Sequence, residues 1–278
     1  MMLSTCYSVL APMATTTFLL QLLSTFLVGS CWIYLTVLAG LRLGSKIGGF
    51  VGGLPSTALL SFFFIGLSQS PEKASSATTI FPIGIAVSGL FLVVYASIVR
   101  RGFVTALLTA LGFWCLSSTT AVILNLDRFE VNLTIYGIVM LFAYLMLEKH
   151  LSIRSISPDT GGHPERYLAA RSIFGGLVVM LSVLFAKTGG PILGGTAAAF
   201  PAMFISVLAV SYKAHGIEFS RAMTKPLLVT GMITVAVYAV AVRYFYIYAG
   251  LYAGTFLSVC VSGVSAGLTY RFVLPRLV

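Results

Sequence analysis

Long apolar runs separated by short polar breaks fill most of the chain. A membrane-spanning α-helix needs about 20 mostly apolar residues, and nine runs come close to that length. We therefore predict an all-α polytopic membrane protein with about nine transmembrane helices. The predicted spans are 18–41, 47–67, 79–99, 102–124, 131–147, 168–186, 191–212, 226–242 and 245–269.

One long polar segment divides these runs into two groups. Residues 148–167, EKHLSIRSISPDTGGHPERY, combine Pro, Gly and charges of both signs. This composition is typical of a hydrophilic loop. We expect the loop to be the boundary between the two halves of the chain.

The two halves carry matching sequence. GGFVGGLP at 48–55 matches GGTAAAFP at 194–201 with an offset of 146 residues, and VYASIVR at 94–100 matches VYAVAVR at 237–243 with an offset of 143. Pro, Glu, Tyr and Arg are scarce in the matching regions, so their recurrence in the same order indicates an internal duplication. The matched pairs are Gly29 with Gly175, Gly44 with Gly190, Pro55 with Pro201, Glu72 with Glu218, Tyr95 with Tyr238 and Arg100 with Arg243.

The duplication predicts two inverted repeats. Four spans fall in each half and one span connects them, so the second half enters the membrane from the opposite side. Inverted repeats recur in secondary transporters, where the substrate binds near the bilayer midplane between the repeats. The predicted organisation is a first four-helix repeat at 1–125, a linker helix with its cytoplasmic loop at 126–163, and a second, inverted four-helix repeat at 164–278.

Composition supports the membrane assignment, and charge orients the chain. Hydrophobic residues make up 58% of the 278 residues and charged residues only 9%, against roughly 25% charged residues in soluble domains. With nine spans, 13 of the 17 Lys and Arg residues fall on one side, which we predict to be the cytoplasmic side of the cell (inner) membrane. The N-terminus is then outside and the C-terminus inside. This topology accounts for the net charge of +10, so nucleic acid is not an expected partner.

Glycine and proline interrupt the second and seventh predicted spans at matching places. Both are unfavourable inside helices, by about 1 kcal/mol for Gly and about 3 kcal/mol for Pro relative to Ala. Such breaks in two inverted halves point to a binding site, whereas glycine pairs also let neighbouring helices approach closely. Both interpretations stay open for Gly48, Gly49, Pro55, Gly194, Gly195 and Pro201.

Two tyrosines and five charged residues complete the set of candidates. Tyr95 and Tyr238 are candidate pathway residues, with anchoring at the membrane interface as the alternative. For the two acidic candidates, salt bridges to nearby Lys73, or to Arg221 and Lys225, are the alternative to a functional role. The charged candidates are Glu72, Glu218, Arg100, Arg243 and Lys187.

Motifs typical of enzymes are missing from the sequence. There is no GxSxG, HExxH, paired-carboxylate or P-loop pattern. The four cysteines are scattered, and no Asp or Glu lies inside a predicted span. We therefore expect no catalytic residue, no metal site, no cofactor and no proton coupling through an intramembrane carboxylate.

The second half contains a segment that resembles a known family. GGTAAAFPAMFISVLAVSYKAHGIEFSRAM, with FP followed by a G-x-E-x-x-R group, resembles the small GlpM-type membrane proteins. Those proteins are single four-helix units, so the resemblance implies two such units fused through a linker helix. The first half keeps LP at 54–55 and Glu72, but Ser75 stands where the motif has Arg.

The plan of four helices, a linker and four more helices is similar to that of two other groups. It resembles the drug/metabolite transporter superfamily and the two-domain fluoride exporters. The polar pore Asn that the second helix of those exporters carries is missing here, so we do not expect a fluoride exporter.

These features together favour a transporter. We expect a small solute or a lipid-linked molecule to cross by alternating access between the repeats. An anionic or amphipathic substrate is slightly favoured because the ionisable groups at the membrane faces are mostly basic. The alternatives are a non-transporting scaffold that assists envelope or lipid biosynthesis, and a passive channel or lipid scramblase. The lipid bilayer is the expected partner, and an oligomer stays open.

Overall fold

The computed structural model describes residues 2–42, 55–153 and 168–273. Within these ranges the chain forms helices and no strands. Six helical segments of the described residues are long and apolar enough to cross a membrane, which confirms a helical protein of membrane character. These segments are Thr16–Leu35, Phe81–Arg101, Phe103–Ile123, Phe129–His150, Leu168–Lys213 and His215–Leu268.

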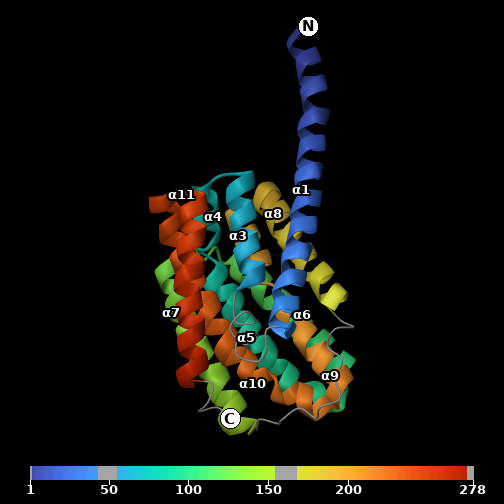
Figure 1. Cartoon of the computed structure of the whole chain (residues 1–278), viewed down its shortest axis with the longest axis vertical. Coiled ribbons are helices and arrows are strands. Elements are labelled where there is room, and N and C mark those ends of the chain that lie inside the picture. The colour runs from blue at the N-terminus through green and yellow to red at the C-terminus, as the bar shows by residue number, and fades with distance from the viewer. Residues whose placement is uncertain (1, 43–54, 154–167, 274–278) are drawn as a thin grey trace.

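In the described part of the first half, helices from α3 onward are joined by short turns (Figure 1). Ser70 caps one of them: its hydroxyl accepts a hydrogen bond from the backbone N–H of Lys73, and Pro71 occupies the first helical position, where the missing N–H is harmless. The helices are α1 (Met2–Arg42), α3 (Ser56–Ser68), α4 (Pro71–Ala77), α5 (Phe81–Ile98) with the short η1 (Val99–Arg101), and α6 (Phe103–Ile123).

The predicted linker is also helical, and longer helical segments follow it. α7 covers Phe129–Leu145 and continues into η2 (Met146–His150), a turn of π-helix. The predicted spans 79–99, 102–124 and 131–147 therefore agree with α5, α6 and α7 to within a few residues. The remaining elements are α8 (Leu168–Ala198), α9 (Ala202–Ala222), α10 (Thr224–Pro226), the π-helical η4 (Leu227–Gly231), α11 (Met232–Leu268) and η5 (Thr269–Val273).

Three glycines reverse the chain direction within the long helical segments. Gly190, Gly216 and Gly250 have φ angles of 85°, 81° and 75°, a region that favours glycine because other residues clash there. Across Gly250, the Ser262 hydroxyl donates to the carbonyl of Thr234, 28 residues earlier, at 3.1 Å. In a straight helix these residues would be about 42 Å apart. The segment is therefore a hairpin of two packed helices.

The last hairpin corrects one predicted boundary. The sequence pattern predicts a break between 242 and 245, beside Arg243, but the helix continues to Gly250. Arg243 is held inside α11 because its carbonyl accepts a hydrogen bond from the Ser75 hydroxyl at 2.7 Å, and its guanidinium donates to the Thr79 hydroxyl at 3.0 Å. A charged side chain with polar partners does not end a helix.

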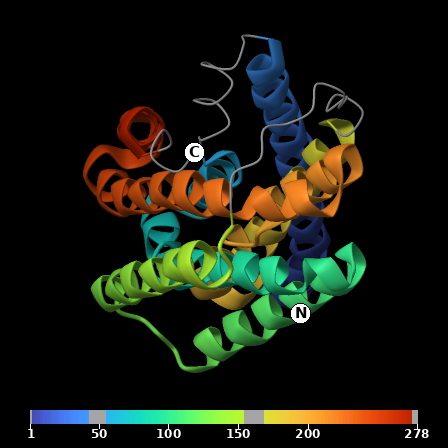
Figure 2. The same ribbon diagram turned by 90° about the horizontal axis from the view of Figure 1, so that it is seen from below.

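The two halves of the chain share one hydrophobic core. α1 packs along α8, α3 lies against α8, and α4 lies against α11. Figure 2 shows helices of the first half interleaved with those of the second. Described residues of the regions 1–125 and 164–278 therefore pack against each other in one core.

Small residues bring α1 and α8 close together. A Cβ atom placed on Gly176 would lie 2.8 Å from the carbonyl oxygen of Phe26 and 2.8 Å from the backbone nitrogen of Ser30. Close backbone approach through small residues is a common way for membrane helices to associate. The outer faces of α6 and α7 instead expose large apolar side chains such as Leu116 and Ile138, as helices in contact with lipid do.

Gly176→Ala should separate α1 from α8. We expect a loss of about 1–3 kcal/mol of stability, because the added methyl group meets backbone atoms that cannot rotate away. The matched control is Gly137→Ala in α7, where a Cβ atom would have open space within 4 Å. Thermal unfolding in detergent should show a lower midpoint for Gly176→Ala and an unchanged or higher midpoint for Gly137→Ala. Equal midpoints would contradict the close α1–α8 contact.

Candidate functional site

Two prolines precede two helices with nearly the same backbone geometry. Pro55 has φ −77° and ψ 58° and directly precedes α3; Pro201 has φ −77° and ψ 40° and directly precedes α9. Neither helix has a side-chain cap at its start. The first-turn N–H groups, for example those of Thr57 and Phe204, have no acceptor within their own helix. Both helices therefore begin with a cluster of N–H donors.

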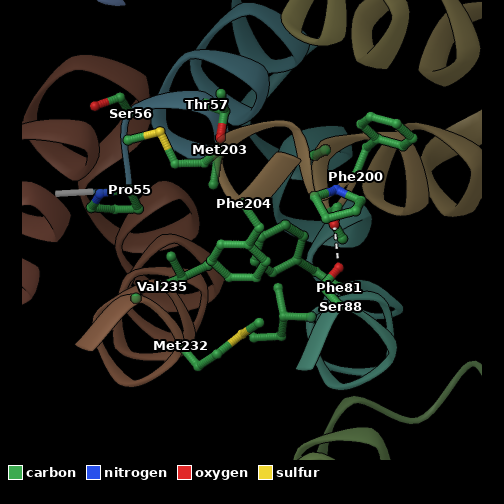
Figure 3. A pocket seen from close by; sticks show the side chains of 16 residues that line it. Pro55, Ser56, Thr57, Phe81, Ser88, Phe200, Met203, Phe204, Met232 and Val235 are labelled. Carbon is green, nitrogen blue, oxygen red and sulfur yellow. Dashed lines mark hydrogen bonds between the residues drawn. The ribbon is translucent and has the colours of Figure 1, made fainter. Parts of the chain in front are cut away.

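Both prolines line the same cavity. The space open to the centres of water-sized molecules is about 80 Å³, enough for several waters. Its walls come from the starts of α3 and α9, the end of α8, and parts of α5, η4 and α11 (Figure 3). Phe81, Phe204 and Met232 contribute much of the apolar surface. We call this space the proline cavity.

A buried hydrogen-bond network supports the break before Pro201. The hydroxyl oxygen of Ser88 in α5 lies 2.9 Å from the carbonyl oxygen of Ala199 and also 2.9 Å from that of Gly84. The same oxygen accepts a hydrogen bond of 2.9 Å from the indole Nε1 of Trp114. Ser88 therefore provides a donor for a carbonyl that the broken helix leaves open. Sequence reasoning did not identify Ser88 or Trp114, because single Ser and Trp residues in apolar runs carry no pattern.

Arg171 brings a positive charge next to the proline cavity. It lines a narrow space of about 10 Å³ together with first-turn residues of α3 and α9, including Thr57 and Met203. Its Nη2 lies 2.7 Å from the sulfur of Met203, and its Nε is buried with no hydrogen-bond partner among the described residues. Thr57 and Met203 also line the proline cavity, so the two spaces are neighbours.

A wider cavity lies on the other side of Arg171. It has a volume of about 350 Å³, and its lining includes Arg171, Ser206 and Lys213. Ser206 also lines the narrow space at Arg171. The wider cavity at Lys213, the narrow space at Arg171 and the proline cavity are therefore neighbours in that order, because each adjacent pair shares lining residues. Arg171 and Lys213 are among the basic residues that orient the predicted topology. Arg171 lies inside the predicted span 168–186, and an ionisable residue within a span is itself a signal of function.

Gly194 and Gly195 do not line these cavities. Gly195 is packed against the backbone of Ala77 at the end of α4, and Gly194 is packed against Ala186 across the Gly190 turn. Both positions lack room for a Cβ atom, which is the geometry that close helix packing requires. Gly48 and Gly49 lie outside the described residues.

The candidate tyrosines are fully buried between helices. The Tyr95 hydroxyl is 2.7 Å from the Ser220 hydroxyl. The ring of Tyr238 stacks on Phe62 with 6.5 Å between centroids. The alternative interpretation of these tyrosines as interfacial anchors is therefore wrong, because an anchor has to reach the lipid headgroups. Neither tyrosine lines the cavities described above.

The charged candidates lie outside the cavities. Arg100 and Glu218 form an exposed two-pronged ion pair, with Nε–Oε1 at 2.8 Å and Nη2–Oε2 at 3.1 Å. The expected partners of Glu218 are engaged elsewhere: Lys225 is buried in an ion pair with Glu148, and Arg221 donates to two backbone carbonyls. An exposed pair of this kind contributes about 0–1 kcal/mol.

The remaining charged candidates interact with rings or stay in solvent. Lys187 lies 4.2 Å from the ring centre of Phe18, and the guanidinium of Arg243 lies 4.5 Å from that of Phe129. Glu72 is exposed near the start of α4. Its pKa lies below the ordinary value because the hydroxyl of Ser70 and a backbone N–H donate to the carboxylate. None of these contacts forms a site.

Ser88→Ala should destabilise the break before Pro201. The substitution leaves the Ala199 carbonyl and the Trp114 indole without their shared partner, and an unsatisfied buried group costs about 1–3 kcal/mol. The control is Ser97→Ala on the same helix, whose hydroxyl bonds only the carbonyl of Val93 one turn earlier. The thermal midpoint in detergent should fall for Ser88→Ala and stay near wild type for Ser97→Ala. A similar midpoint for both variants would rule out a supporting role for Ser88.

Comparison with known proteins adds no family to this picture. No protein-family model, no curated protein and no solved structure matches the chain. The resemblance of the second half to GlpM-type proteins stays a prediction. What the site binds must therefore be inferred from its own residues, the two uncapped helix starts and Arg171.

Proposed function

We propose that the protein is a membrane transporter that moves a small solute or lipid-linked molecule by alternating access between two inverted repeats. The observation that carries the proposal is the meeting of Pro55 and Pro201 at one cavity. These prolines occupy matching positions 146 residues apart. Broken helices at matching positions, facing one buried site, are typical of secondary transporters.

Matching elements around the two prolines support the inverted repeats. α3 is followed by a break at Ser70 and then by α4; α9 contains a break at Gly216, again 146 residues later, and then continues. In Figure 1, α4 lies toward the upper end of the molecule, whereas α9 and α10 lie toward the lower end. Segments that match in sequence thus lie toward opposite ends, which is the arrangement expected of inverted halves.

Hydrogen bonds between the halves follow the same correspondence. Ser75 and Arg221 occupy matching positions in the sequence. The Ser75 hydroxyl donates to the carbonyl of Arg243 in α11, and the Arg221 Nε donates to the carbonyl of Ala96 in α5 at 3.0 Å. Each half therefore binds a helix of the other half through the same sequence position, although the donor side chains differ.

The nine-span topology is part of the proposal. The glycine turns at Gly190 and Gly250 each divide a long apolar segment into two helices, and α3 is a shorter apolar helix that begins at the proline cavity. With the bias of positive charges, this count puts the N-terminus outside and the C-terminus in the cytoplasm of a cell with an inner membrane.

Alternating access needs a site that is open to one side at a time. The cavity beside Arg171 and Lys213 is lined by these two basic residues, both of which the charge bias assigns to the cytoplasmic side. Exchange of the conformations of the two halves would close this route and open the corresponding route on the other side. A difference of a few kcal/mol between the two states is enough to hold most molecules in one of them.

The cavity supports transport over the alternatives. A non-transporting scaffold for envelope or lipid biosynthesis would need no space with hydrogen-bond donors in its interior. A passive channel or scramblase would need a path open to both sides of the membrane, whereas the space at Arg171 has a volume of only about 10 Å³. The proline cavity therefore favours a gated route.

Substitution of the two prolines should bias access in opposite directions. In a cysteine-free background carrying Thr57→Cys, a membrane-impermeant thiol reagent reports the side from which the cavity is reached. Pro201→Ala restores a backbone N–H, so helical hydrogen bonding can continue across the break, and this should favour one access state. Pro55→Ala should favour the other access state for the same reason. We expect the ratio of labelling from the two sides to shift in opposite directions for the two variants.

The matched control is Pro71→Ala at the first position of α4, away from the cavity, which should leave the labelling ratio unchanged. Equal labelling ratios in wild type, Pro55→Ala and Pro201→Ala would leave packing as the role of the breaks and remove the case for transport.

A further inference from the structure

Arg171 carries a partly buried positive charge with a fully buried Nε, and no carboxylate among the described residues compensates this charge. The ion pairs of these residues join Arg100 to Glu218 and Lys225 to Glu148. The contact that Arg171 does make is with the thioether of Met203, which is a weak acceptor. A partly buried charge that no carboxylate of the described residues compensates is unfavourable, so its position points to a negative group that is bound for part of the time.

The neighbouring backbone is arranged for the same kind of ligand. Thr57 and Met203 belong to the first turns of α3 and α9, and both line the space beside Arg171. The N-terminus of a helix carries roughly half a positive charge together with unbonded N–H groups, which is why such termini bind anions. Two helix starts and a guanidinium converge here, so three sources of positive potential act on one point.

The Met203 side chain occupies the position next to the Arg171 guanidinium that a bound anion would take. Its sulfur lies 2.7 Å from Nη2 of Arg171, and its side chain lines both the narrow space and the proline cavity. Methionine is flexible and adapts to irregular spaces. Rotation of this side chain would open the guanidinium to the proline cavity without movement of the backbone.

We propose that Arg171 and the first turns of α3 and α9 bind the phosphate or carboxylate group of the transported molecule. Arginine suits this role because its planar guanidinium presents parallel donors to two oxygens of such a group. The inference rests on the proposed function in one respect: it treats the bound anion as the cargo.

An adjoining apolar cavity bears on the source of the anionic group. A space of about 250 Å³ between α6 and α8 is lined almost entirely by apolar side chains such as Leu177 and Phe185. Phe174 lines both this space and the wider cavity beside Arg171, and Phe200 lines both this space and the proline cavity. An acyl chain would fit beside an anionic head group, so a lipid-linked anion and a free anion share the same polar site.

The test compares anion-dependent stabilisation in matched variants of the full-length protein. Purified protein in a neutral detergent is titrated with inorganic phosphate, and separately with dodecyl phosphate, against sodium chloride at equal ionic strength. Arg171→Met removes the charge but keeps an apolar stem. Arg171→Lys keeps the charge but loses the planar fork. The control Arg101→Met removes an exposed charge outside the cavities.

A ligand that binds only the folded protein raises the thermal midpoint, by about 3 °C or more at a tenfold excess over its Kd. We expect this rise in wild type and in Arg101→Met, a smaller rise in Arg171→Lys and none in Arg171→Met. Without anion, Arg171→Met should be as stable as wild type or more stable, because an unpaired buried charge is gone. A rise with both ligands identifies a free anion as sufficient, and a rise with dodecyl phosphate alone identifies a lipid-linked one.

Two results would overturn the inference. One is a wild type whose midpoint responds to neither ligand beyond the chloride control. The other is an undiminished rise in Arg171→Met. If Arg171→Met does not fold, an undiminished rise in Arg171→Lys overturns the inference, and a reduced rise supports it.

The outcomes separate the anion site from transport. Anion-dependent stabilisation through Arg171 without any shift of access in the proline variants would support the anion site and contradict the proposed transport. A shift of access without anion-dependent stabilisation would support the proposed transport and contradict an anionic substrate.

Discussion

Backbone N–H and C=O groups inside a bilayer need partners within the protein, because the hydrocarbon provides none and each unsatisfied group costs several kcal/mol. The breaks at Pro55 and Pro201 open two helices and so create such groups. Burial in the protein and around an internal cavity makes the breaks tolerable, and Ser88 supplies a donor to the carbonyl of Ala199. The central architecture follows from this requirement.

The same requirement links packing to function. The first turns of α3 and α9 line the cavity, and their N–H groups have no acceptor within their own helix. The two helix starts therefore give the cavity a positive potential. The close contacts at Gly176 and Gly195 hold α8 against α1 and α4 and keep both breaks at one place. Arg171 adds a full charge beside Met203. A polar site enclosed in apolar helices is what the proposed binding of an anionic cargo would require.

The parts of the fold that depend on hydropathy could be predicted from the sequence. α5, α6 and α7 are uninterrupted apolar runs, so their bounds were predictable to within a few residues. The turn at Gly250 was not, because a glycine in an apolar run does not reveal a positive φ, and the nearby Arg243 suggested a false boundary. Pro55 and Pro201 stood out because proline is rare inside spans and both recur at one offset.

The chemistry around the prolines was harder to predict because it depends on tertiary contacts. Arg171 lies close to the start of the predicted span 168–186, where a basic residue indicates orientation as readily as a site, and its sequence position does not show which groups it meets. Only the packing of α8 on α3 and α9 brings it to the two helix starts. Likewise, the burial of Tyr95 against Ser220 could not be read from its position one turn before Arg100.

Inversion of the two halves is the central claim, and the sidedness of two matching residues tests it most directly. Glu72 and Glu218 occupy equivalent positions, and both side chains reach solvent. Glu72→Cys and Glu218→Cys, each in a cysteine-free background, are treated in intact cells with a membrane-impermeant thiol reagent, with permeabilised cells as the reference. The account predicts that Glu72→Cys is labelled in intact cells and Glu218→Cys only after permeabilisation. Labelling of both cysteines from the same side would contradict it.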